Sequence, residues 1–207
     1  MINAAGEIQS SKFGGNSDLT LPSVQVFTVK KDVDADKEEI INAWEDFMAS
    51  KESAITPYSS YPRSLNGDEW DEYRGGRLRV NFRDDTSAET PFLGAPIATV
   101  FYSGSSMALW NGTDPYYIDK ITLTDSVTVN GLSMSASVTP SGASVSGAFN
   151  ATTITMSDSR NQAWMLGHFY NNIQVRGLPT SVEKNSQAAF EIGGITRYVN
   201  AYDYARF

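Results

Sequence analysis

Apolar and polar side chains alternate along much of this chain with the two-residue period of a β-strand. Residues 24–29 place apolar side chains on both sets of alternate positions, so they predict a strand that is buried on both faces. Residues 160–170 fit either a short helix or a buried strand. Further runs predict a strand at Ile173 and Val175, a turn at Gly177-Leu178-Pro179 and a last hairpin over 189–199 around Gly193-Gly194. The pattern indicates a mainly β protein, an antiparallel β-sandwich or barrel-like domain.

One segment follows the helical period instead. Its apolar residues recur at spacings of three and four and predict an amphipathic helix of about residues 37–50; they are Ile40, Ile41, Trp44, Phe47 and Met48. Asp36 and Glu39 match a capping box at the start of this helix. Alternate aspartates over 32–36 also fit the opening of a calcium-binding loop, but Lys37 and Ala43 stand where that loop needs Gly and Glu. The capped helix is therefore favoured, and an α+β fold is the alternative class.

Residues 126–157 form a long stretch without charge, in which the apolar positions change phase twice. With Ser141-Gly142 as a two-residue turn, the phase changes at Asn130-Gly131 and Thr152-Thr153 fall opposite each other. We therefore predict one long hairpin with a shared bend. Its register pairs Val138 with Val145, Ala136 with Gly147, Met134 with Phe149, Leu132 with Ala151, Val129 with Ile154 and Val127 with Met156.

The other face of this hairpin is small, polar and neutral, and a free edge without charged residues invites pairing with another strand. Three partners could cover it: a second sheet of the same domain, a neighbouring subunit, or a bilayer crossed by a pore-forming stem. We expect the hairpin to be an assembly interface. The interface residues on this hypothesis are Val127, Val129, Leu132, Met134, Val138, Ser141, Gly142, Val145, Phe149, Ile154 and Met156.

A basic strand is predicted after Gly75-Gly76, where polar and apolar residues alternate from position 77 to 83. The arginines exposed by this alternation, with one that precedes it, are Arg74, Arg77, Arg79 and Arg83. They could form a solvated surface, contact nucleic acid, or meet an acidic segment of another copy. The acidic segment would consist of Asp32, Asp34, Asp36, Glu38 and Glu39.

The two ends of the chain differ in character. Residues 1–22 show no period and predict an extended N-terminal arm, either disordered or ordered on a neighbour, which leaves 23–207 as a single β-rich domain. The last residues form an aromatic tail, Tyr202, Tyr204 and Phe207, that we expect to dock on its own domain or on a neighbour. Residues 56–71 are predicted to form a loop region that ends in a turn. Aromatic residues within and after it could bind carbohydrate or serve as packing, namely Trp70, Tyr73 and Trp110.

Composition narrows the classes of function. The 207 residues have a formal net charge of −8, which argues against binding duplex nucleic acid through overall charge. The chain has no Cys, and His168 is its one histidine, so disulfide scaffolds, thiol catalysis and zinc fingers are excluded. No phosphate loop, dinucleotide fingerprint or nucleophile elbow occurs, so we expect neither an enzyme nor a cofactor. The N-terminus has no basic region followed by an apolar run, which favours synthesis in a cytosol.

These features together predict a non-catalytic structural subunit of a homomeric assembly. A virion component made in a host cytoplasm fits them best, such as a phage tail-tube, head-tail joining or capsid-decorating protein. Its partners would be copies of itself and other structural proteins of the particle, with nucleic acid only as packaged or transiting cargo. One alternative is an extracellular pore-forming toxin with 126–157 as the membrane-inserting stem, and another is a carbohydrate-binding module.

Overall fold

The computed structural model describes residues 23–30, 42, 62–90, 97–112, 118–139, 142–148 and 150–207, and these form nine strands. In chain order the strands are β1 (Ser23–Lys30), β2 (Arg63–Tyr73), β3 (Gly76–Glu89), β4 (Ala98–Asn111), β5 (Lys120–Val138), β6 (Ser144–Ala148), β7 (Ala151–Asn161), β8 (Ala163–Ile192) and β9 (Ile195–Arg206). The predicted arm over 1–22 and all but one residue of the predicted helix lie outside the described residues.

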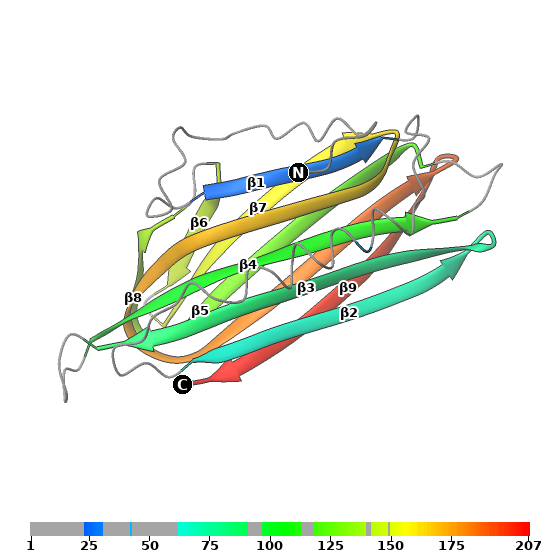
Figure 1. Cartoon of the computed structure of the whole chain (residues 1–207). Coiled ribbons are helices and arrows are strands. Elements are labelled where there is room, and N and C mark those ends of the chain that lie inside the picture. The colour runs from blue at the N-terminus through cyan, green and yellow to red at the C-terminus, as the bar shows by residue number, and fades with distance from the viewer. Residues whose placement is uncertain are drawn as a thin grey trace.

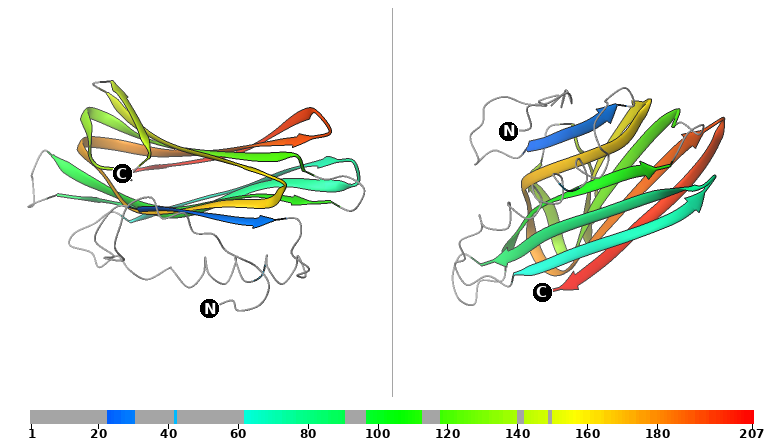
Figure 2. Two further views of the ribbon diagram at one scale, coloured as in Figure 1. Left: turned by 90° about the horizontal axis from the view of Figure 1, so that it is seen from above. Right: turned by 45° about the vertical axis from the view of Figure 1, so that its right-hand side comes forward.

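Every described strand pairing is antiparallel, and the sheet order is β2-β3-β4-β8-β5-β7-β6, with β1 and β9 also pairing with β8. The sheet folds over on itself into two layers (Figures 1 and 2). The first layer holds β1, β2, β3, β4 and residues 163–177 of β8, and the second holds β6, β7, β9, residues 178–192 of β8 and the part of β5 before its own bend. The predicted fold class, a mainly β sandwich or barrel-like domain, is confirmed.

The 30-residue strand β8 joins the two layers because it bends and continues. Its first part pairs with β1, β4 and the end of β5, and its second part pairs with the rest of β5 and with β9. The turn predicted at Gly177-Leu178-Pro179 is this bend. The chain changes direction there, but the strand does not end.

The bend of β8 explains the first phase change in β5. The pairing of β5 with β8 shifts register between Asn130, opposite Ser181, and Gly131, opposite Pro179, so both strands bend together. Gly131 has a φ of 153°, and a Cβ at this position would lie 2.0 Å from the carbonyl oxygen of Leu178. The close approach of the two backbones therefore requires glycine at position 131.

The predicted long hairpin is wrong in its register and in its outer half. β5 pairs with β7 two residues out of the predicted register, with Val127 opposite Ile154. Residues 132–138 leave β7 and pair with β8, whereas β6 folds back on β7. A shift of two residues keeps every side chain on its predicted face. Val127, Ile154 and Met156 consequently remain buried.

Other predictions have mixed outcomes. The strand over 24–29 is confirmed as part of β1, and the last hairpin turns at Gly193-Gly194 as predicted. Residues 160–170 are strand, divided between β7 and β8.

The loop predicted over 56–71 is wrong for its described part, because β2 begins at Arg63. Asn66-Gly67 indicated a turn, but a Cβ on Gly67 would lie 2.2 Å from the Phe82 ring, so glycine gives that ring its space within a regular strand.

Candidate functional site

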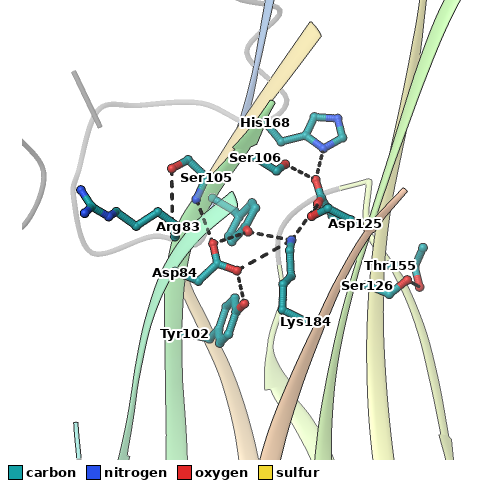
Figure 3. A network of polar contacts seen from close by, with 12 residues as sticks. Arg83, Asp84, Tyr102, Ser105, Ser106, Asp125, Ser126, Thr155, His168 and Lys184 are labelled. Atoms are coloured by element: carbon teal, nitrogen blue, oxygen red, sulfur yellow. Dashed lines mark hydrogen bonds and ion pairs between the residues drawn. The ribbon is translucent and has the colours of Figure 1, made fainter. Parts of the chain in front are cut away.

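Two acidic and two basic side chains lie between the two layers, each at most 1% exposed (Figure 3). Asp84 comes from β3 in the first layer and His168 from the first part of β8. Asp125 on β5 and Lys184 on the second part of β8 come from the opposite layer. Burial of a charge is costly unless the charge is paired, and two acids and two bases meet here. We call these four residues the buried charge cluster.

Asp125 is the most heavily bonded member of the cluster. Its Oδ1 lies 2.7 Å from Lys184 Nζ and accepts a hydrogen bond of 2.5 Å from Ser186. Its Oδ2 lies 2.5 Å from His168 Nδ1 and accepts a hydrogen bond from Ser106. Burial would raise the pKa of Asp125, but the charges of Lys184 and His168 and their hydrogen bonds hold it well below its usual range.

Lys184 is fully buried and lies between the two acids. Its ammonium donates to Tyr170 Oη at 2.7 Å and contacts Asp125 Oδ1 at the same distance. Asp84 Oδ2 is farther away, at 3.9 Å. The Nζ also lies 4.5 Å from the centre of the Tyr170 ring, a cation–π distance.

Asp84 is held by hydroxyl groups. Tyr170 donates to its Oδ1 at 2.6 Å, the Ser105 amide donates to the same oxygen at 3.1 Å, and Tyr102 donates to Oδ2. Burial raises the pKa of Asp84 to about 6, although Lys184 and the two tyrosines act in the opposite direction. Burial and the neighbouring Asp84 also raise the pKa of both tyrosines, so both remain protonated donors.

His168 connects the cluster to the edge of β7. Its Nε2 makes no hydrogen bond and lies 3.5 Å from Asp158 Oδ2, whose side chain is 22% exposed. Burial acts to lower the pKa of His168, but the hydrogen bond with Asp125 and the negative charges of Asp125 and Asp158 raise it above its usual value. The protonated imidazole is thus placed to donate to Asp125.

The cluster can do chemistry only among its own groups, because its four members are enclosed by both layers. It combines a nucleophile, Lys184, with the carboxyl of Asp125, a proton donor at His168 and an acid of raised pKa at Asp84. In the part of the chain that the structure describes, no group of three or more His, Asp or Glu side chains is placed to hold a metal ion.

Sequence reasoning missed this cluster, although a signal was present. Asp84 follows the inward row of Leu78, Val80 and Phe82 in phase. Asp125 lies two residues before Val127, and Lys184 two residues after Val182, again in phase with buried positions. Charged residues of opposite sign on apolar rows predict buried pairing.

Some of the residues predicted as an assembly interface are buried, and others are exposed. The structure buries Val127, Val129, Met134, Ile154 and Met156 in the core, so their side chains are not available to a partner. Leu132, Gly142 and Val145 are exposed, and Leu132 lies opposite the exposed Leu178. Ser141, Phe149 and the side chain of Val138 lie outside the described parts.

The predicted alternation of the basic strand is confirmed, because Leu78, Val80 and Phe82 are buried in β3. Its guanidiniums meet partners on or next to β2. Arg79 makes two hydrogen bonds of 2.7 Å to Asp68, and Arg77 lies 4.2 Å from the centre of the Trp70 ring. Arg74 lies 5.1 Å from the Tyr73 ring, and Arg83 is exposed. The acidic segment predicted to meet these arginines, Asp32, Asp34, Asp36, Glu38 and Glu39, lies outside the described residues.

The aromatic residues named in the sequence analysis also differ in their exposure. Tyr202 and Tyr204 are half-exposed on the outer face of β9, whereas Phe207 packs against the core. Trp110 is only 3% exposed, so it cannot share an open carbohydrate platform with the exposed Trp70. Packing is therefore the role of Trp110.

No protein-family model matches this chain, and no curated protein matches its sequence. Among the described residues, no helix has the length and apolar character needed to span a membrane.

Proposed function

We propose that this protein is a non-catalytic structural subunit of a homomeric assembly, and that the assembly is a virion. A phage tail-tube, head-tail joining or capsid-decorating protein is the kind of component proposed. It would be made in a host cytoplasm and would bind copies of itself and other structural proteins of the particle.

The observation that supports this proposal is the edge strand β6. All five of its residues, Ser144–Ala148, are exposed, and the strand carries no charge. It pairs with β7 on one side, and no strand of the described part of the chain pairs with its other side. Natural sheets protect such edges with charges, proline or a covering element. A neutral edge that no described strand covers fits a strand that is paired when the protein is assembled.

A second copy is the partner that this edge fits. Two β6 strands can pair antiparallel across a two-fold axis, so that backbone hydrogen bonds extend the sheet from one copy into the next. Val145, which is 49% exposed, would be covered by this pairing. The proposed interface is thus centred on β6 and no longer includes the buried residues of the predicted hairpin.

Substitution of Val145 by lysine tests the interface. Sedimentation velocity of the full chain at rising concentration should show assembly by the natural protein, and rings, tubes or shells should appear in negative stain. We expect Val145→Lys to weaken self-association by about tenfold or more, since a charge would have to be buried in the joined sheet.

Ile195→Lys is the matched control. Ile195 is 45% exposed and lies next to the turn between β8 and β9, so the substitution changes the same property at a different edge. Association of this variant should equal that of the natural protein. A natural chain that stays monomeric at every concentration, or equal loss in both variants, would contradict assembly through β6.

A further inference from the structure

We propose that Lys184 and Asp125 become joined by an amide bond between Nζ and Cγ, an internal cross-link that the chain forms from its own side chains. This inference concerns the buried charge cluster, and it does not depend on the proposed assembly.

The first support is the placement of the two reacting groups. Asp125 lies opposite Ser186 and Lys184 opposite Val127, so the two residues are diagonal neighbours on paired strands. Lys184 Nζ is 2.7 Å from Asp125 Oδ1, and both side chains are fully buried. A fixed contact of this kind between a nucleophile and a carboxyl gives the reaction a high effective concentration in the absence of water.

The second support is that the ammonium of Lys184 has more N–H donors than hydrogen-bond acceptors around it. An ammonium has three N–H donors, and the structure gives this one two acceptors at hydrogen-bond distance, Tyr170 Oη and Asp125 Oδ1. Asp84 Oδ2 is at 3.9 Å, beyond a hydrogen bond. An amide nitrogen would keep a single N–H, for which Tyr170 Oη is a sufficient partner.

The third support is a base that can take a proton from Lys184. Tyr170 Oη accepts from Lys184 and donates to Asp84, so the three groups form a continuous proton path. Nucleophilic attack needs the neutral amine, and ionised Asp84 is the group that can remove the proton. Its pKa of about 6 lets it be ionised near neutral pH and still accept a proton.

The fourth support is the set of donors around the carboxyl. His168 and Ser106 face Oδ2, and Ser186 faces Oδ1. Protonated His168 can give its proton to Oδ2, which makes that oxygen a leaving group. Ser186 can stabilise the charge that forms on Oδ1 during the reaction.

The step is balanced without an added reactant. The Nζ–Cγ bond forms, the Cγ–Oδ2 bond breaks, and no atom is oxidised or reduced. The Lys184 nitrogen loses two protons and Oδ2 gains two, with Asp84 and His168 serving as temporary acceptor and donor. One water molecule leaves, and Oδ1 becomes the amide oxygen.

Mass spectrometry of the denatured full chain is the test. We expect the purified natural protein to be lighter than its sequence by the mass of one water molecule. Lys184→Met and Asp125→Ala should each restore the full mass, whether or not these variants fold. Lys120→Met is the matched control, because Lys120 makes an exposed ion pair with Glu191 at 3.3 Å, and this variant should keep the loss of water.

Peptide mapping then identifies the bond. Trypsin should fail to cut after Lys184 and should release a branched peptide that contains Lys184 and Asp125. Asp84→Asn should slow or abolish bond formation while circular dichroism shows an unchanged fold.

A natural chain of full mass would overturn the proposal. So would a loss of water that survives Lys184→Met, which would indicate a cyclised aspartate, or a branch at Asp84 instead of Asp125. These outcomes are separate from those of the assembly test, since a monomer can carry the cross-link and an assembly can lack it.

Discussion

Asp84 makes the stability of this protein depend on pH. Its pKa is about 6 in the folded protein and 3.8 in its ordinary state, so the folded form holds the proton more tightly. The stabilisation is complete below about pH 3.8 and is lost as the pH rises through 6. The shift corresponds to about 3 kcal/mol. We expect the free energy of unfolding, measured in urea, to lose most of this amount between pH 4 and pH 7.

Asp84→Asn should remove that loss, because the amide does not titrate. The titratable groups that face Asp84 are Lys184, Asp125, Tyr102 and Tyr170. The pKa of Asp125 is lowered and the pKa values of both tyrosines are raised, so none of these three moves into this range. An amide bond at Lys184 would remove the ammonium that lowers the pKa of Asp84, so the direction of the effect is the same with the cross-link. An equal fall in stability in the variant would contradict this assignment.

At the scale of single residues, the sequence predicted which side chains point into the core, but it did not predict which residues contact one another. The period of two placed Leu78, Val80 and Phe82 inside because burial follows the pleat. It could not show that Asp84 and Lys184 meet, since they are far apart in the chain and come from opposite layers. The same limit applied to Arg79. Its partner Asp68 lies on β2, a segment whose turn-forming residues had indicated a loop.

At the scale of elements, the shared bend of β5 and β8 depends on Gly131. Gly131→Ala should lower the free energy of unfolding by about 2 kcal/mol or more. The new Cβ would overlap the carbonyl oxygen of Leu178, and the φ of this position is unfavourable for alanine. Urea titration monitored by tryptophan fluorescence would measure the loss.

Gly147→Ala is the comparison for this variant. Gly147 lies on exposed β6, where the nearest atom to a new Cβ is 3.3 Å away. Its effect should be well below 1 kcal/mol. Equal effects of the two substitutions would show that close backbone approach at Gly131 does not limit the fold.

The hairpin over 126–157 shows which element properties follow from sequence. Its antiparallel pairing and its inward faces were correct for β5 and β7, because a shift of two residues preserves the pleat. The register was wrong because two coincident phase changes had different causes. One is the bend of β5 against β8, and the other is the turn that separates β6 from β7.

At the scale of the whole molecule, the fold class followed from alternation, but the connection between the layers did not. Gly177-Leu178-Pro179 has the composition of a turn between two strands. The structure uses these residues to bend one strand, because β4 pairs with it up to Gly177 and β5 pairs with it on both sides of the bend. Local chemistry alone cannot distinguish a turn from a corner that neighbouring strands hold in place.

A strand that belongs to both layers also determines how the protein can open. Neither layer can separate from the other without breaking the pairing of β8 with β4 or β5, which are among the most extensive pairings in the described structure. Unfolding should therefore be a single cooperative event. Amide hydrogens on both sides of the bend, near Leu166 and near Val182, should exchange with deuterium at the same slow rate, whereas those of β6 exchange first.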